Sequence, residues 1–399
     1  MITTERKKLA VEPGLTKRSL IGRLWGSSLI LTVVFLVLID AALAYVKPLS
    51  FFDVTEFVPL EQNPMVAKLK SFIEDRGANP EAYVLGSSLM LFPAVRCDEE
   101  LAGKKHRYDS WFIRHGINGA LSPRYLSQQL ERAAGRPVAV VNLGVQGSIV
   151  SDQLLVLQRA LEKGKTPRLV FLELAPRSLL DNWHKNLNAT PIHQVLADLS
   201  AVPDLLAAGK LDKETLSILP GYFWYFYKVK ADYRTLVVNL SASILNRPLN
   251  SWEALRGIRH KPVQGLFNPE MEWNVDYTPQ PRYQDLPMYK EVYNPPDAAF
   301  WKQERSDLDK FLALAGRHHV KVILVDMPAT TKNLALIDPA YLARYRLTID
   351  ELASSGVPVL RLAESGQFTE DDFEDSAHLN AQGGHKLFAA MSQAFAQIK

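Results

Sequence analysis

Cysteine is almost absent from the sequence: Cys97 is the only one among 399 residues. A single cysteine forms no intramolecular disulfide and builds no cysteine-based metal site. Histidines with the spacing of metal ligands are lacking too, because the neighbours His318 and His319 would point to opposite faces of a strand. The histidines in the middle of the chain are scattered, at His184, His193 and His260. We therefore expect no metal and no cofactor.

Net charge is also lacking outside the first residues. The chain carries a formal charge of +3, and residues 1–23 hold six basic and two acidic residues, a net charge of +4. Residues 24–399 are therefore left with −1. Such a near-neutral body lacks the basic surface that binds nucleic acid, so we exclude that class. The glycines fit neither a dinucleotide fingerprint nor a phosphate loop, and the chain has no internal repeat.

One long apolar run is present, residues 24–46, in which Asp40 is the only charged residue. The run is long enough to cross a bilayer, which predicts a transmembrane anchor. A cleaved signal peptide is the alternative, because Ala42-Leu43-Ala44 resembles a cleavage site. Basic residues precede the run and Lys47 alone follows it. The rule that basic residues stay inside predicts a cytoplasmic tail at 1–23 and an extracytoplasmic, periplasmic-side body. We expect Asp40 to reach the headgroups or to meet a membrane partner.

After a predicted stalk at 47–64, strand and helix patterns alternate within a domain at 65–399. This alternation predicts an α/β fold with a parallel sheet covered by helices on both faces. The expected strands are 82–85, 138–142, 168–174, 320–325 and 358–362, and the expected helices are 65–76, 122–134, 151–163, 298–315, 339–354 and 381–397.

Residues 178–297 interrupt the alternation and are predicted to be an insertion. They contain six consecutive aromatic residues at 222–227. Three interpretations stay open for these side chains: packing within the insertion, stacking on sugar rings, or lying on the membrane surface.

The candidate nucleophile is Ser88. It follows the strand 82–85 and Gly86, and a glycine allows a tight turn that presents the next side chains at the carboxyl edge of a sheet. A Gly-Ser-Ser sequence alone is also typical of an ordinary loop. Two further segments strengthen the functional interpretation.

The first segment is Asp375-Ser376-Ala377-His378. An aspartate three residues before a histidine can accept a hydrogen bond from one ring nitrogen, which leaves the other nitrogen to accept a serine proton. The second segment runs from Asn142 to Ser148, directly after a predicted strand. Backbone N–H groups at glycines there could stabilise an oxyanion, with Gly147 as first choice and Gly144 as second. A plain strand-to-helix turn is the alternative.

Taken in order, these three segments resemble the SGNH (GDSL-like) hydrolase superfamily, over residues 80–177 and 298–399. The resemblance implies a flavodoxin-like three-layer sandwich. Gly86-Ser87-Ser88, the Asp-Ser-x-His-Leu-Asn ending at 375–380 and the anchor are similar to the membrane-anchored SGNH proteins that work with MBOAT acyltransferases. Those proteins modify cell-envelope polymers, as in alginate acetylation or teichoic-acid alanylation.

The resemblance implies Ser88 as nucleophile, His378 as general base and Asp375 as its orienting carboxylate, with backbone N–H groups of Ser88 and Gly147 in the oxyanion hole. The family's third motif offers an asparagine, whereas Arg177 stands at about that position here. We expect Arg177 to donate to the oxyanion, to bind a substrate carboxylate, or to be a surface residue. Asn182 lies nearby but outside the motif. A missing donor costs about 10²–10³ in rate.

The resulting expectation is a membrane-anchored, extracytoplasmic O-acyltransferase or esterase that forms an acyl-serine. Its acceptor would be a cell-envelope or exported polysaccharide, or a teichoic-acid-like polymer, and its partner an integral-membrane acyltransferase of the MBOAT type. Two alternatives stay open. One is a tethered carbohydrate esterase that uses water as acceptor, and the other is a non-catalytic polysaccharide-binding scaffold.

Overall fold

The structure is a computed structural model, and it describes a set of residues that makes up most of the chain. These are residues 28–51, 64–75, 77, 79–103, 122–184, 190–199, 202–203, 216–217, 219–245 and 282–398. The predicted tail at 1–23, most of the predicted stalk and residues 246–281 of the insertion lie outside them.

Five strands form one sheet in which every pair of neighbours is parallel, in the order β2-β1-β3-β4-β5. The predicted parallel α/β sheet is thus confirmed, with β2 and β5 shorter than expected. The strands are β1 (Ala82–Leu85), β2 (Val140–Asn142), β3 (Leu169–Leu174), β4 (Lys321–Asp326) and β5 (Val359–Arg361).

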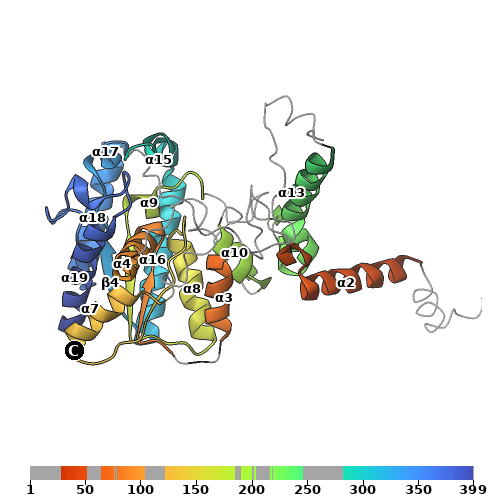
Figure 1. Ribbon diagram of the computed structural model, residues 1–399, viewed down its shortest axis with the longest axis horizontal. Coiled ribbons are helices and arrows are strands. Elements are labelled where there is room, and N and C mark those ends of the chain that lie inside the picture. The colour runs from red at the N-terminus through yellow and green to blue at the C-terminus, as the bar shows by residue number, and fades with distance from the viewer. Residues whose placement is uncertain are drawn as a thin grey trace, which may run out of the picture.

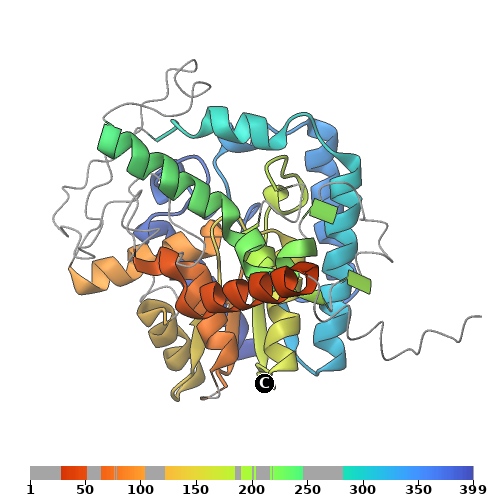
Figure 2. The same cartoon turned by 90° about the vertical axis from the view of Figure 1, so that its right-hand side faces the viewer.

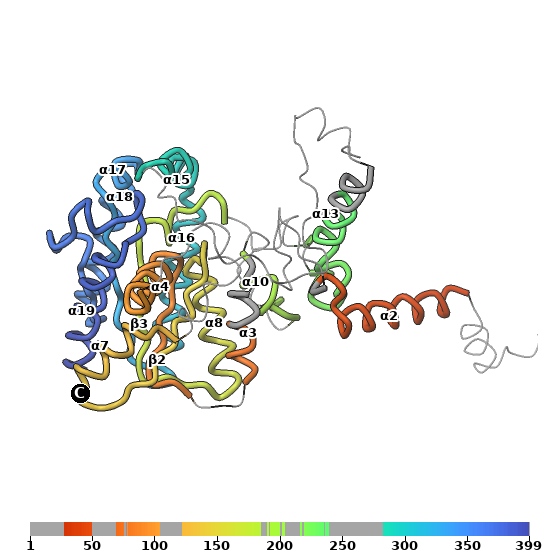
Figure 3. The backbone as a smooth tube through the Cα atoms, viewed as in Figure 1, coloured from red at the N-terminus to blue at the C-terminus, as the bar shows by residue number. Residues whose placement is uncertain are grey.

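Helices cover both faces of this sheet, as the predicted three-layer sandwich requires. One face carries three mutually packed helices: α4 (Ser88–Ala102), α7 (Arg124–Ala134) and α19 (Ala381–Gln397). The other face carries α8 (Val150–Glu162) and α16 (Ala298–Arg317), with α18 (Pro339–Ser354) beside α16 through the rings of Trp301 and Tyr341. Figures 1 and 3 show α7 and α19 at the left of the body, with α8 to the right of them.

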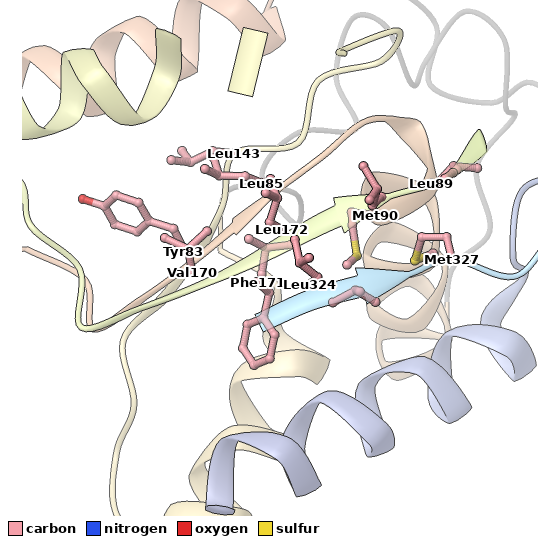
Figure 4. Close-up of a cluster of buried hydrophobic side chains, with 14 of the residues drawn as sticks. Tyr83, Leu85, Leu89, Met90, Leu143, Val170, Phe171, Leu172, Leu324 and Met327 are labelled. Atoms are coloured by element: carbon pink, nitrogen blue, oxygen red, sulfur yellow. The ribbon is translucent and has the colours of Figure 1, made fainter. Parts of the chain in front are cut away.

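The sheet is the centre of the core. Every residue of β1 and β3 is buried, as expected for a parallel sheet with both faces covered. Figure 4 shows Tyr83, Leu85, Phe171 and Leu172 of these strands in the buried cluster that also contains Leu89 and Met90 of α4. Each such side chain contributes about 1.5–3 kcal/mol by leaving water.

Helix α4 is not among the helices predicted from the sequence. Most of its residues are buried, so it has no exposed polar face to produce the usual amphipathic period, and Pro93 lies inside it. Ser87 begins the helix as its N-cap, because its hydroxyl accepts a hydrogen bond from the N–H of Leu89 at 3.2 Å. Ser88 is therefore the first helical residue.

Shorter helices complete the body. In Figure 1, α15 and α17 lie at the top of the body and α9 lies below them. The bounds are α3 (Pro64–Glu74), α9 (Pro176–Leu179), α10 (Pro191–Leu196), α15 (Leu286–Tyr293), α17 (Thr331–Leu334), η1 (Pro48–Phe51), η5 (Leu219–Tyr222) and η6 (Glu370–Asp372).

The N-terminal helix α2 (Ser28–Val46) has 19 residues and lies within the predicted span. It is long and apolar enough to cross a membrane, and none of its residues is buried. A signal sequence would have the same properties, so the two interpretations from the sequence both remain. Figure 1 shows α2 and α13 (Tyr225–Leu245) apart from the sheet.

Asp40 has a partner that neither expectation from the sequence included. Its carboxylate accepts hydrogen bonds from the backbone N–H groups of Tyr225 at 2.9 Å and Phe226 at 2.7 Å. Those are the first residues of α13, so Asp40 caps that helix and joins the insertion to α2 (Figure 2). In the aromatic run, Tyr225 packs on a small cluster of Leu49, Val229 and Leu236.

The remaining aromatic side chains of the run differ in their exposure to solvent: Tyr222 and Tyr227 are partly buried, and the other three are exposed. Phe223, Trp224 and Phe226 are exposed by 65%, 40% and 44%. Packing within the insertion therefore accounts for only part of this segment. His318 and His319, expected at the start of a strand, instead lie exposed in the turn before β4.

Candidate active site

The carboxyl ends of β1, β2 and β3 meet at one edge of the sheet, where open α/β folds bind ligands. Ser88 follows β1, the loop from Asn142 to Gly147 includes the end of β2 and continues past it, and Arg177 follows β3. His378 comes from a loop between η6 and α19. Four segments far apart in the sequence therefore contribute to one site.

Three of the predicted residues form a continuous hydrogen-bonded chain. Ser88 Oγ lies 2.8 Å from His378 Nε2, and His378 Nδ1 lies 2.7 Å from Asp375 Oδ2. Asp375 Oδ1 also accepts hydrogen bonds from the N–H groups of Ala377 and His378. In the tautomer that donates from Nδ1 to Asp375, Nε2 is the acceptor that faces the serine. The structure thus brings the residues together, while their catalytic roles stay predictions.

The charge on Asp375 suits this arrangement. Burial alone would raise the pKa of its carboxyl group. The charge of His378, with hydrogen bonds from its ring and from backbone N–H groups, outweighs burial and lowers the pKa. Asp375 is therefore ionised near neutral pH and can stabilise a positive imidazole.

The turn that presents Ser88 is held by Glu173, a residue that sequence reasoning missed. The backbone N–H and the hydroxyl of Ser87 donate to the Glu173 carboxylate at 2.6 and 2.8 Å. A Cβ at Gly86 would lie 2.6 Å from Glu173 Cβ, so only glycine fits there. Glu173 is 1% exposed, and burial raises its pKa to about 7.

The loop that carries His378 is held by the helix that begins with Ser88. Arg96 of α4 makes two hydrogen bonds of 2.7 Å to the carboxylate of Glu374, next to Asp375. Phe92, also in α4, places its ring edge-on to the His378 imidazole, with the centroids 4.2 Å apart. One helix therefore fixes both the nucleophile and its base.

A second support comes from the segment before α15. Asp285 accepts hydrogen bonds from the hydroxyl and the N–H of Ser376 at 2.6 and 3.1 Å. Asn333 also donates to the Ser376 hydroxyl at 2.8 Å. The insertion's last described part therefore helps to hold the Asp-x-x-His turn.

The two predicted oxyanion glycines differ in what their N–H groups do. Gly144, the second choice, donates its N–H to Asn142 Oδ1 at 3.0 Å, and its role in the oxyanion hole stays a prediction. Within the described part of the chain, the N–H groups of Ser88 and Gly147 donate to no other residue. The loop is held over the nucleophile turn by a hydrogen bond from the N–H of Val145 to the carbonyl of Gly86, at 3.0 Å.

Arg177 is not the surface residue that one expectation allowed. Its side chain is 14% exposed, and its Nε donates to Asp181 Oδ2 at 3.0 Å. Its Nη2 would be 3.9 Å from a Cβ on Gly147, so the guanidinium borders the predicted oxyanion loop. Donation to the oxyanion and binding of a substrate carboxylate both remain predictions. Asn182 points elsewhere, because its amide donates to the carbonyls of Glu291 and Pro295.

Asp181 and His184 lie beside Arg177 and were also missed as a pair. His184 Nδ1 is 2.8 Å from Asp181 Oδ2. The available signal was their spacing, which repeats the Asp-x-x-His spacing of Asp375 and His378.

No protein-family model matches the chain, and no curated protein matches it either. Several solved structures are similar to it. A lipase/acylhydrolase from Enterococcus faecalis is 12% identical, with a TM-score of 0.36, over 79% of this chain and 96% of the other. An acylhydrolase from Bacteroides fragilis is 10% identical, with a TM-score of 0.35, over 85% of this chain and 97% of the other.

A lipolytic protein of the G-D-S-L family from Desulfitobacterium hafniense is 10% identical, with a TM-score of 0.32, over 78% of this chain and 98% of the other. At these identities and TM-scores we draw no conclusion about chemistry from the three proteins. The functional proposal rests on the geometry of the chain itself.

Proposed function

We propose that this chain is a membrane-anchored serine acyltransferase or esterase of SGNH type, in which Ser88 carries the acyl group. The observation that carries the proposal is the hydrogen-bonded chain from Ser88 through His378 to Asp375, with distances of 2.8 and 2.7 Å. A buried serine in contact with an oriented imidazole is the arrangement that nucleophilic acyl transfer needs.

In the first step, Ser88 Oγ attacks the carbonyl carbon of an ester while His378 Nε2 takes the hydroxyl proton. The negative oxygen that develops accepts hydrogen bonds from the N–H groups of Ser88 and Gly147. His378 then gives its proton to the leaving alcohol, which leaves an acyl-serine. Asp375 stays ionised throughout and stabilises the imidazolium.

In the second step, a hydroxyl group attacks the acyl carbon, and His378 accepts its proton. The Ser88 Oγ–carbon bond breaks, and the proton passes to Ser88 Oγ. A polymer hydroxyl as acceptor makes the protein a transferase, and water makes it an esterase. We propose the transferase, with a cell-envelope polysaccharide or teichoic-acid-like polymer as acceptor.

A location at the extracytoplasmic membrane surface fits this acceptor. The apolar helix α2 supplies the anchor, and the basic residues before it favour a cytoplasmic N-terminus. The cap that Asp40 provides for α13 keeps the exposed Trp224 and Phe226 close to α2. Aromatic side chains are typical of the membrane–water interface. An integral-membrane acyltransferase of the MBOAT type is the proposed source of the acyl group.

The test is made in cells that depend on this chain for surface acylation. Cells with Ser88→Ala should lose labelled acyl groups from their surface polymer, although the protein is present in normal amount. Unchanged acylation would refute the proposal. If instead changes at the exposed aromatics Phe223 and Trp224 abolished acylation and Ser88→Ala did not, the chain would be a binding scaffold.

A further inference from the structure

The chain contains a second imidazole–carboxylate pair built like the one in the proposed triad. Asp181 Oδ1 accepts hydrogen bonds from the N–H groups of Trp183 at 2.8 Å and His184 at 3.1 Å, and Oδ2 lies 2.8 Å from His184 Nδ1. Asp375 makes the same set of contacts with the two N–H groups and the ring of its own turn. Each turn therefore presents a histidine whose Nε2 points away from its aspartate.

The second imidazole faces the loop that should hold the oxyanion. His184 Nε2 is 3.0 Å from the position that a Cβ on Gly147 would take. Gly147 has a φ of +76° and no side chain, so the imidazole approaches the backbone directly. Within the described residues, no side chain or backbone group forms a hydrogen bond with His184 Nε2, and the side chain is 15% exposed. This nitrogen is thus available to a bound molecule.

The side chains of Asp181 and Arg177 determine the electrostatic surroundings of His184. Burial would raise the pKa of the Asp181 carboxyl, but the hydrogen bond from His184 and the charge of Arg177 lower it. Asp181 is therefore ionised, and the permanent charge of Arg177, 3.0 Å away, already balances it. In the tautomer that donates from Nδ1 to Asp181, His184 keeps an acceptor lone pair on Nε2.

We propose that His184 is the binding residue for the acceptor, and that it accepts a hydrogen bond from a hydroxyl group of a polyol or sugar. The inference rests on the proposed function, because it concerns the second step of that reaction. His378 removes the proton of the attacking hydroxyl, so His184 holds a neighbouring hydroxyl of the same molecule. No proton is transferred to it, and no bond to it is formed.

Two attachment points explain why a sugar would compete with water. In the proposed complex, one hydroxyl group contacts His378 and another hydroxyl group of the same molecule contacts His184, which fixes the attacking oxygen near the acyl carbon. Such orientation speeds the reaction because the acceptor loses its translational and rotational entropy when it binds, and not in the transition state. Water has a single oxygen and gains nothing from the second contact. Asp181 and Arg177 act as positioning residues, since they hold His184.

The test uses the full chain in detergent, with p-nitrophenyl acetate as donor and glycerol as probe acceptor. The initial burst of p-nitrophenol reports acylation of Ser88, and the ratio of acetylglycerol to acetate reports the choice of acceptor. His184→Ala should lower that ratio by roughly 3- to 10-fold, the value of one neutral hydrogen bond. The burst rate should stay within about twofold, because the triad is untouched.

The matched control is His193→Ala in α10. His193 also has an aspartate partner, with Nδ1 2.8 Å from Asp152 Oδ1. The His193→Ala variant should leave both the burst rate and the ratio of acetylglycerol to acetate unchanged. A ratio unaffected by His184→Ala would overturn the acceptor site. An equal fall of burst rate and transfer would do so too, because it would make His184 a donor to the oxyanion or a structural residue.

Failure of the proposed function has a different signature. Wild-type protein that is folded but shows no burst would refute an activated Ser88, and the acceptor site with it. A normal burst with an unchanged product ratio in His184→Ala would refute the acceptor site alone.

Discussion

Replacing Glu173 with glutamine should change how the stability of the protein depends on pH. The carboxyl group is 1% exposed, and burial raises its pKa to about 7, against an ordinary value of 4.5. Between these values the native state keeps a proton that the unfolded state has lost. The contribution of Glu173 to stability is therefore full below pH 4.5 and falls as the pH rises to about 7.

The size of the effect follows from the shift. Each pKa unit corresponds to about 1.4 kcal/mol, so a shift of roughly 2.5 units predicts a loss of about 3 kcal/mol across this range. Glu173→Gln keeps the shape of the side chain and removes the titration. The difference in unfolding free energy between wild type and variant should change by about 3 kcal/mol from pH 4.5 to above 7, in favour of the variant at the higher pH.

The assay is urea unfolding of the full chain in detergent at a series of pH values, followed by tryptophan fluorescence. The matched control is Glu351→Gln, which removes an exposed carboxylate of α18. Its difference in unfolding free energy from wild type should not change with pH. If this difference did not change with pH for Glu173→Gln, it would contradict the account of a buried carboxyl group with a raised pKa beneath the nucleophile turn.

Three further substitutions test the supports of the site and the contact with α2. Gly86→Ala would place a methyl group 2.6 Å from Glu173 Cβ, so labelling of Ser88 by a fluorophosphonate should slow at least about tenfold; an unchanged rate would be inconsistent with a tightly packed turn. Arg96→Met leaves Glu374 without its two 2.7 Å hydrogen bonds and should cost about 3 kcal/mol in urea unfolding, and a loss well under 1 kcal/mol would argue against this support. Asp40→Leu removes the cap of α13, worth about 0.5–2 kcal/mol, and should speed proteolysis within that helix, whereas an unaltered cleavage pattern would mean that the cap is unimportant.

The strands could be predicted because they are short apolar runs that end at glycine or polar residues. Helix α4 could not, since a helix buried on most sides has no amphipathic period and Pro93 argues against one. The resemblance implied that Ser88 and His378 meet, but without this helix the local sequence patterns gave no physical reason for the contact. The contact between Arg96 and Glu374 spans 278 positions, and no local pattern reveals it.

The predicted triad residues could be found because each stands in a short motif with its own local chemistry. Glu173 could not, because one carboxylate in an apolar strand has no local signature and its partner Ser87 is 86 positions away. Gly144 shows that a local pattern can also suggest a role that the contacts do not support. Its sequence context suits an oxyanion donor, yet its N–H donates to the Asn142 side chain. Asp181 and His184 carried a readable signal, the repeated Asp-x-x-His spacing, that a search for repeats of motifs would have detected.

The central claim is an activated Ser88, and intact-mass measurement of the full chain after exposure to a fluorophosphonate tests it most directly. Wild type would be compared with Ser88→Ala and His378→Ala, each shown to be folded. The account predicts one adduct on wild type and none on either variant. An adduct that persists in Ser88→Ala, or folded wild-type protein that takes up none, would contradict it.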